Sequence, residues 1–217
     1  MSKQSIWVFL KQRTTLSDEA IAGIMGNFEA ESNCEACRLQ GDFTADRSKS
    51  KAYAQAVMTG AKSAEAFAQD AQGWGLAQWT FWSRKEGLLN ACRSRGVNID
   101  DETSQLEWFL IEMQQGEYSA CWQQLLSCRD IYSAADVVCR KYEKPAVCNV
   151  QYRATKGQEI YNQFHNTPAP DPAPAPAPEP QPIPDNSLRQ ILIEYLEADI
   201  AVKQNILLEL KGGAGYG

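Results

Sequence analysis

The sequence predicts a mainly α-helical domain, a proline-rich linker and one further helix. Apolar residues recur every three or four positions over much of the first 164 residues, which is the period of an α-helix with one buried face. No stretch alternates convincingly between apolar and polar residues, as a half-buried strand would. Near residue 167 the composition changes abruptly to proline and alanine.

The clearest helix is expected to begin at Ser17. Ser17 is a suitable N-cap, and the acidic Asp18 and Glu19 follow it in the first turn, where they favour the positive end of a helix. The apolar residues that then follow at helical spacing are Ile21, Ile24, Met25 and Phe28. Together these signals predict a helix that runs to about residue 32.

Five more helices are expected by the same periodicity. They centre on residues 88–92, 106–113, 121–126, 134–142 and 152–164. The fourth of them should end at Lys144-Pro145, because the residue before a proline disfavours helical backbone. Residues 38–80 have no comparable pattern, and a small β-hairpin could be accommodated there.

The proline-rich stretch divides the chain into three parts. Thr167 to Pro184 alternates proline with alanine and acidic residues, which favours an extended polyproline spacer. We therefore expect a domain at residues 1–165, a linker at 166–185 and a C-terminal piece at 186–217. Ser187 to Lys211 reads as a single amphipathic helix that packs on a second copy, the main domain, a virion or a membrane surface. The alternative is a weakly ordered tail.

Charge and hydropathy exclude several classes of protein. The net charge of -6 and the pI of about 5.0 make nucleic acid an unfavourable partner, because phosphate binding requires basic residues. No apolar run approaches the length of a membrane span, and the apolar stretch at residues 6–10 is too short for a secretion signal. We therefore expect a protein that is made in the cytoplasm.

The cysteines are expected to be free thiols. Their odd count of seven and the expected cytoplasmic synthesis favour a reduced state. Cys34-x-x-Cys37 could form half of a zinc site, but the chain has no second pair of this spacing, and its one histidine, His165, is distant in sequence. We expect neither a metal nor another cofactor.

Glu31 is the first candidate for catalysis. Successive residues of an α-helix are rotated by about 100° around its axis. Measured from Ile21, the apolar arc begins with Ile24 at about 300°, and Glu31 lies at about 280°, just outside that arc. Glu29 falls further from that arc. Partial burial would raise the pKa of the Glu31 carboxyl, and a protonated carboxyl can serve as a general acid. The alternative is an ordinary surface acid at the end of a helix.

The second candidate is the segment from Gly73 to Thr80, with the sequence GWGLAQWT. Aromatic rings can stack on sugar faces, and an amide can bridge sugar hydroxyls, so Trp79 and Gln78 suit a carbohydrate cleft. The alternative is a tight turn with core tryptophans.

These motifs, in their order and spacing, resemble the phage tail-tip lysozyme family. The matching segments are GNFEAES at 26–32, LQG at 39–41, GWGLAQWT at 73–80 with Arg84-Lys85, QLEWFL at 105–110, and YEKP at 142–145 with Arg153. The family belongs to a wider lysozyme-like group that includes soluble lytic transglycosylases. The resemblance spans about residues 17–161 and implies a lysozyme-like helical domain.

The resemblance also implies roles for individual residues. Glu31 matches the catalytic acid, and Ser32 is its neighbour in the family's Glu-Ser pair. The substrate-binding residues it implies are Ser32, Gly75, Gln78, Trp79, Thr80 and Arg84. Residues 33–37 depart from the family's usual Gly-Phe-Asn-Pro, which leaves the loop after the catalytic helix undetermined.

The sequence is compatible with more than one type of reaction. A two-carboxylate glycosidase needs a second acid, for which Asp70 is best placed in the sequence, ahead of Asp42 and Asp46. With Glu31 alone the enzyme could act as a lytic transglycosylase, and Thr80 could instead position a hydrolytic water. We favour hydrolysis, because the resemblance implies a muramidase.

The expected protein is thus a bacteriolytic, antimicrobial enzyme of phage or prophage origin that acts on peptidoglycan. It is either an endolysin that reaches the wall after holin-type release or a lysin carried in a virion. The C-terminal helix would then serve a homo-oligomer or virion docking. A third reading is a tail component that keeps the fold and binds glycan without cutting it.

Overall fold

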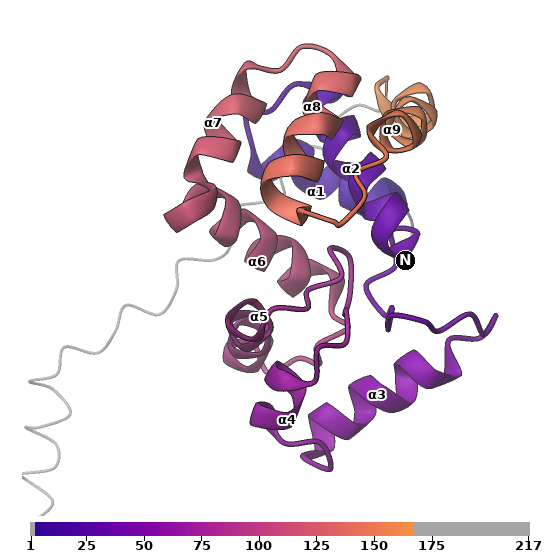
Figure 1. Ribbon diagram of the computed structural model, residues 1–217, viewed down its shortest axis with the longest axis vertical. Helices are drawn as coiled ribbons and strands as arrows, with labels where there is room; N and C mark the ends of the chain where they lie inside the picture. The colour runs from indigo at the N-terminus through magenta and orange to yellow at the C-terminus, as the bar shows by residue number, and fades with distance from the viewer. Residues whose placement is uncertain (1–2, 167–217) are drawn as a thin grey trace, which may run out of the picture. The chain divides into compact units, whose positions relative to one another are not determined.

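The computed structural model describes residues 3–166, and within them the chain is almost entirely helical (Figure 1). The elements in order are α1 (Lys3–Arg13), α2 (Asp18–Ser32), α3 (Ser48–Thr59), α4 (Ala64–Gln69), α5 (Trp82–Ser94), α6 (Glu102–Gln114), the 3₁₀ turn η1 (Gly116–Tyr118), α7 (Ser119–Ser127), α8 (Ile131–Val138), the π-helical turn η2 (Cys139–Glu143) and α9 (Val150–Phe164). The mainly α-helical prediction is confirmed. The linker and the C-terminal helix lie outside the described residues.

Helix α2 is the centre of the upper part of the domain in Figure 1 and packs against α1, α8 and α9. Its cap is as expected, since the Ser17 side chain accepts a hydrogen bond from the Ala20 amide. Helix α9 approaches α2 closely, because a Cβ atom added at Gly26 would lie 2.2 Å from the Arg153 carbonyl oxygen. Glycine at this position therefore lets α9 bring the Arg153 side chain near the end of α2.

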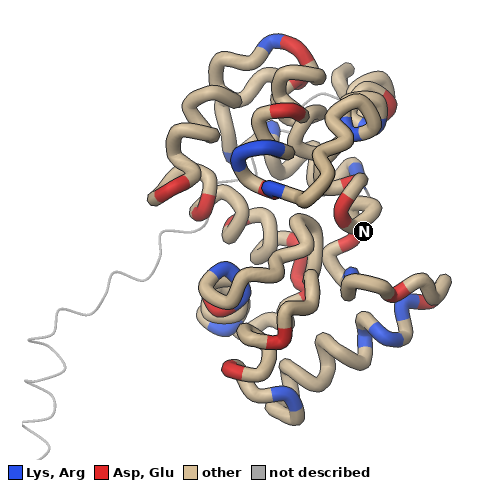
Figure 2. The backbone as a smooth tube through the Cα atoms, viewed as in Figure 1, with Lys and Arg blue, Asp and Glu red and all other residues tan. Residues whose placement is uncertain are grey.

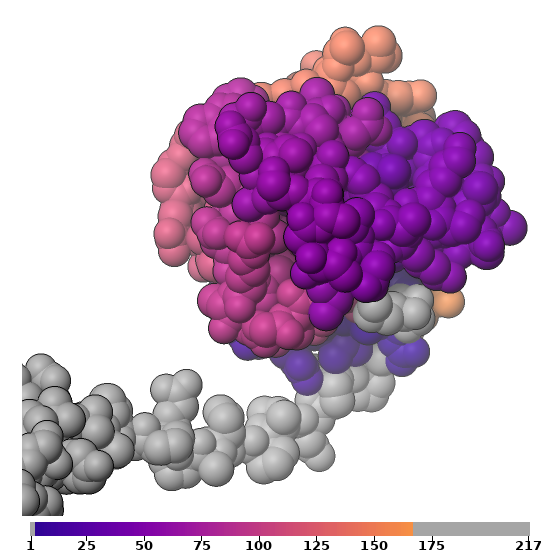
Figure 3. Space-filling model, turned by 90° about the horizontal axis from the view of Figure 1, so that it is seen from below, coloured from indigo at the N-terminus to yellow at the C-terminus, as the bar shows by residue number. Residues whose placement is uncertain are grey.

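The lower part of the domain consists of α3, α4 and α5 (Figure 1). Figure 3 looks onto this end, where the segment that includes α3 and α4 covers much of the face. Lys85 of α5 is fully buried and donates a hydrogen bond to Asp70 at 2.5 Å and one to the Tyr53 hydroxyl at 3.2 Å. This buried cation and its partners tie the three helices together.

Segment 73–80 forms a tight turn, and the described residues contain no regular β-hairpin. The strand-like pairs of this segment among the described residues are two isolated bridges, which join Leu39 with Trp74 and Trp74 with Trp79. Gly75 has a φ of 74°, and a Cβ at this position would lie 2.5 Å from the Gln105 side-chain oxygen. Glycine is therefore required both by the backbone conformation and by the packing of α6.

Helical periodicity located six helices and missed three others. The six are α2, α5, α6, α7, α8 with η2, and α9, and the chain leaves helical backbone at Lys144, which has a φ of 49°. The missed helices are α1, α3 and α4. Within the described residues, none of the helices has the length and hydropathy that a membrane span requires.

The expectation that all cysteines are free is wrong for one pair. Cys139 and Cys148 form a disulfide, with their Cα atoms 6.2 Å apart. The other five cysteines are free thiols. The number of cysteines does not indicate which of them lie close together in the fold. Here the chain turns back after η2 and brings Cys148 next to Cys139.

Candidate active site

Glu31 lies in the last turn of α2, which ends where Asn33 adopts left-handed backbone with a φ of 61°. Its side chain is 20 % exposed, and Oε1 accepts a hydrogen bond from Arg153 Nη2 at 2.7 Å. Glu31 therefore stands at the border of the buried face, as its helical angle indicates, and its carboxylate is oriented by an arginine.

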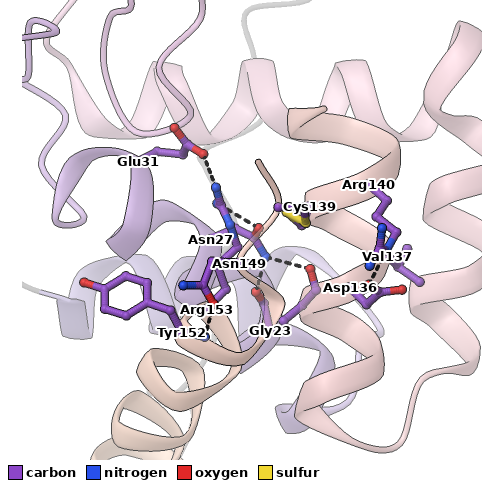
Figure 4. Close-up of a disulfide and its surroundings, with 12 residues drawn as sticks. Gly23, Asn27, Glu31, Asp136, Val137, Cys139, Arg140, Asn149, Tyr152 and Arg153 are labelled. Carbon is purple, nitrogen blue, oxygen red and sulfur yellow. Dashed lines mark hydrogen bonds and ion pairs between the residues drawn. A yellow bond between two sulfur atoms is a disulfide. The ribbon is translucent and has the colours of Figure 1, made fainter. Parts of the chain in front are cut away.

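Arg153 is itself held in place by buried polar groups. Its Nη1 donates to the Asn27 side-chain oxygen at 3.0 Å, and Asn27 Nδ2 donates to the carbonyl oxygens of Gly23 and Ala135 at 2.8 and 3.2 Å. Figure 4 shows the Arg153 side chain reaching between Asn27 and Glu31 beside the disulfide. The guanidinium thus stabilises the negative charge of Glu31 from a fixed position.

Ser32 joins the end of α2 to the segment 73–80. Its hydroxyl donates to the Leu76 carbonyl oxygen at 2.9 Å, and the side chain is buried. Ser32 is therefore close to Glu31 in sequence but turned into the protein. It positions the Gly-rich segment against the helix and has no surface for direct contact with a ligand.

Trp79 requires a correction, because the structure makes it a core residue. Its side chain is 0 % exposed, and its indole N–H donates to Glu112 Oε2 at 2.7 Å and to the Tyr142 hydroxyl at 3.2 Å. An indole with both faces buried cannot stack on a sugar. The tight turn with core tryptophans, which the sequence left as the alternative, is the arrangement found.

Gln78 is also committed to the protein. Its backbone has a φ of 46°, and its side-chain amide donates to the carbonyl oxygens of Arg38 and Gly75 at 3.1 and 2.9 Å. The amide nitrogen therefore closes the turn, while the residue as a whole is partly exposed, and a role in binding sugar hydroxyls stays a prediction. Thr80, in contrast, is exposed, and its hydroxyl donates to the Gln78 carbonyl oxygen at 2.9 Å.

Arg84 lies in a groove of about 810 Å³ that α5, α6, η1 and η2 enclose. It binds Glu112 through Nε at 2.7 Å and Nη2 at 3.1 Å, and its guanidinium lies 4.4 Å from the centre of the Tyr142 ring. The groove also contains Phe81 and Glu143. Arg84 is thus one of the expected substrate-binding residues that the structure places in a hollow large enough for a ligand.

Glu143 is a partly buried acid that the sequence analysis did not single out. It ends η2 and lines the groove, and its Oε1 is buried without a hydrogen-bond partner among the described residues. Burial, and then the negative charge of Glu31, raise the pKa of Glu143 well above its usual range. The motif YEKP offered a signal, but only the fold places this carboxyl near Glu31.

Asp70 requires a second correction. It receives hydrogen bonds from Lys85 at 2.5 Å and from the Tyr53 hydroxyl at 2.7 Å, and it pairs with Lys62 at 2.9 Å. Burial acts to raise the pKa of Asp70, but the hydrogen bonds from Lys85 and Tyr53 outweigh it and lower that pKa to about 2. Asp70 is a stabilising carboxylate of the lower helices, and none of its contacts reaches Glu31.

The two other aspartates considered for this role also bond locally. Asp42 is fully buried and accepts hydrogen bonds from the amides and hydroxyls of Thr44 and Ser50. Asp46 accepts the Ser48 amide at 3.0 Å, at the start of α3. Both order the loop between α2 and α3.

Two aromatic residues beside the Gly-rich segment are exposed and were not predicted as site residues. Phe81 is 61 % exposed and Trp82 is 52 % exposed. With Thr80 they line a second hollow of about 680 Å³, and Phe81 also lines the groove that contains Arg84. Their position directly after Thr80 was the only signal in the sequence, because periodicity does not tell a buried aromatic from an exposed one.

Comparison with known proteins agrees with this architecture. The family model described as phage tail lysozyme matches residues 2–164, which includes every helix of the described domain. No curated protein matches the chain.

Proposed function

Because the chain belongs to the phage tail lysozyme family, a lysozyme-like family that acts on peptidoglycan, we propose that it is a muramidase. The bond cut is the β-1,4 linkage between N-acetylmuramic acid and N-acetylglucosamine. One observation carries the proposal: Glu31, half-buried at the end of α2, is oriented by Arg153 beside the Gly-rich turn.

In the proposed reaction Glu31 is the general acid. It gives a proton to the glycosidic oxygen as the bond to the sugar C1 breaks, and its carboxylate then assists the attack of water. Arg153 limits the freedom of the Glu31 carboxylate through the 2.7 Å hydrogen bond. A carboxyl held in one orientation loses less entropy when it meets the glycosidic oxygen.

The exposed aromatic residues are the proposed sugar-binding surface. Phe81 and Trp82 can stack on the apolar faces of sugar rings, a role that the buried Trp79 cannot fill. Thr80 lies beside them, and Arg84 and Lys144 line the neighbouring groove. Figure 2 shows basic positions on the turn after α8, in the segment that includes Arg140 and Lys141 and that leads to Lys144 at the groove.

A lytic transglycosylase is the second candidate for the reaction. Asp70 pairs with Lys62 and Lys85, and none of its contacts reaches Glu31, which weakens the support for a two-carboxylate hydrolase. In a transglycosylase the 6-hydroxyl of the muramic acid attacks C1, and the same glutamate serves first as acid and then as base. Mass spectrometry of digested peptidoglycan separates the two, because hydrolysis leaves reducing ends and transglycosylation leaves 1,6-anhydro ends.

Replacing Glu31 by glutamine tests the proposed function. We expect Glu31→Gln to keep the far-ultraviolet circular dichroism of the wild type and to lose at least about 100-fold in the rate of peptidoglycan clearing, since an amide cannot donate the required proton. Glu159→Gln is the matched control, because Glu159 is exposed on α9 and pairs only with Lys156.

Clearing by Glu31→Gln at the wild-type rate would reject Glu31 as the catalytic acid. Wild-type protein that sediments with cell walls but releases neither reducing nor anhydro ends would favour a glycan-binding tail component instead.

Membership of the family indicates a phage protein that acts at the cell wall or in the virion. We propose the virion-associated form over a free endolysin. The support is the description of the family, phage tail lysozyme, together with the few aromatic residues at 186–217.

A further inference from the structure

Asn27 is a fully buried amide on helix α2, one turn before Glu31. The other buried residues of this helix are apolar or small, and asparagine is a poor helix former, so neither packing nor helix stability explains an amide at this position. Buried polar groups persist where they are hydrogen-bonded. The partners of Asn27 therefore indicate what its side chain does.

The Asn27 amide has one orientation that satisfies its partners. Its nitrogen lies 2.8 Å from the carbonyl oxygen of Gly23 and 3.2 Å from that of Ala135, and only N–H groups can donate to these two acceptors. The side-chain oxygen must then face the other way, where it accepts a hydrogen bond from Arg153 Nη1 at 3.0 Å. The amide thus cannot turn over without losing hydrogen bonds in the protein interior.

This single side chain joins three helices. Gly23 belongs to α2 itself, Ala135 to α8 and Arg153 to α9. The short amide reaches α8 because the two helices approach closely, since a Cβ atom added at Gly23 would lie 2.5 Å from the Ala134 Cβ. Asn27 therefore ties the position of the Arg153 guanidinium to the packing of α2 against α8.

Arg153 connects Asn27 to Glu31 through two nitrogen atoms of one planar group. Nη1 donates to the Asn27 oxygen, and Nη2 donates to Glu31 Oε1 at 2.7 Å (Figure 4). Because the guanidinium is planar, a hydrogen bond at one nitrogen restricts the direction in which the other nitrogen can donate. The orientation of the Asn27 amide is thereby passed on to the Glu31 carboxyl.

We propose that Asn27 is a positioning residue: by fixing the plane of the Arg153 guanidinium, it sets the direction in which the Glu31 carboxyl faces the substrate. The inference rests on the proposed glycosidase function and adds a residue whose hydrogen bonds reach Glu31 only through Arg153. Proton donation to a glycosidic oxygen requires a carboxyl in the right place, and a displacement of about 1 Å can cost about 100-fold in rate.

An aspartate cannot replace the amide in this role. It would have nearly the same size as Asn27 but no N–H group, so a carboxylate oxygen would face the carbonyl oxygens of Gly23 and Ala135. Its charge would also compete with Glu31 for Arg153. Asn27→Asp therefore separates the hydrogen bonds of the amide from the volume it fills.

The kinetics of cleavage of soluble peptidoglycan fragments test this role. We expect Asn27→Asp to keep the far-ultraviolet circular dichroism of the wild type and to lower kcat by about 30- to 100-fold, with KM changed by less than about threefold, because the substrate still binds but meets a misdirected carboxyl. Asn162→Asp is the matched control, since Asn162 is exposed on α9 and its side chain bonds to the neighbouring Gln158. A folded Asn27→Asp with the wild-type kcat, or with a loss confined to KM, overturns the proposal.

Arg153→Lys tests the same contacts from their middle and remains informative if Asn27→Asp does not fold. Lysine keeps the positive charge but cannot bind Asn27 and Glu31 through one planar group, so we expect kcat to fall by about 10- to 100-fold. Arg95→Lys is the control, because Arg95 is exposed and pairs with Glu107. A wild-type kcat in Arg153→Lys would mean that charge alone suffices, which contradicts the proposal.

Combining two substitutions shows whether Asn27 acts through Arg153. If it does, adding Asn27→Ala to Arg153→Lys should lower kcat by less than about threefold, although Asn27→Ala alone lowers it at least about 10-fold. A role of Asn27 in packing alone predicts losses that multiply. Multiplied losses would therefore reject the proposed path from Asn27 to Glu31.

The two proposals can fail separately. Glu31→Gln that still cleaves peptidoglycan removes the proposed function. An inactive Glu31→Gln beside an Asn27→Asp with the wild-type kcat removes only the role of Asn27.

Discussion

At the scale of single residues, the same residue types have opposite roles according to where the fold places them. Trp79 is fully buried and Trp82 is half-exposed, although only three positions separate them. Asp70 is bound by two lysines, whereas Glu143 forms no ion pair with the cations of residues 3–166. A carboxyl surrounded by cations stabilises the fold, and a carboxyl without one is available for chemistry.

Asp70→Asn is expected to weaken the fold while leaving cleavage intact. The folded-state pKa of Asp70, about 2, lies below the ordinary value, so its contribution is present near neutral pH and is lost as the pH falls through about 4 to 2. Urea unfolding should therefore show a deficit against the wild type at about pH 7 that disappears at about pH 2. Peptidoglycan clearing that falls by 100-fold or more in a folded Asp70→Asn would restore Asp70 as a catalytic candidate.

At the scale of elements, the turn from α8 to α9 determines the shape of the groove. It contains the π-helical η2, the disulfide and the left-handed Lys144, and it presents Glu143 and Lys144 to the hollow. A π-helical turn widens the backbone by one residue per turn and is often found at functional sites. The strongest local constraint on this turn is the covalent link between its ends.

Removing the disulfide should loosen this turn selectively. We expect Cys148→Ser to lower the free energy of unfolding by about 2–4 kcal/mol, the usual range for a native disulfide. Cys37→Ser, which removes a half-exposed free thiol, is the control. In denaturant without a reductant the wild type should titrate as five thiols, in agreement with one disulfide among seven cysteines. Seven reactive thiols would show that the bond does not form.

At the scale of the whole molecule, the described helices belong to one compact unit, Met1–Pro170. All candidate site residues lie in the first unit. The catalytic unit should therefore fold and act by itself, and residues 186–217 should contribute through assembly or docking.

Deleting residues 186–217 tests this division of labour. We expect the shortened protein to cleave soluble peptidoglycan fragments at the wild-type rate, because no site residue is removed. If the C-terminal segment forms oligomers, the mass from light scattering should fall to that of a monomer. An unchanged monomeric mass would exclude oligomerisation and leave virion docking. Lost cleavage would mean that residues 186–217 are needed for activity.

The sequence by itself determined the helical character of the domain, the family and the place of Glu31. These follow from local signals: apolar residues at helical spacing, the Ser17 cap, the stop at Lys144-Pro145 and the ordered set of motifs. Helices α1, α3 and α4 were not predicted, because their sequences carry weak local signals and tertiary packing supplies most of their stability.

Only the tertiary structure decided which groups surround Glu31 and which side chains reach the groove. Arg153 is 122 residues from Glu31 in the chain, and the indole of Trp79 meets Glu112 across 33 residues. Such partners depend on how the helices pack, and helical periodicity specifies only which face of each helix is buried. The sequence therefore could not predict three features: the pairing of Glu31 with an arginine, the raised pKa of Glu143 and the burial of Trp79.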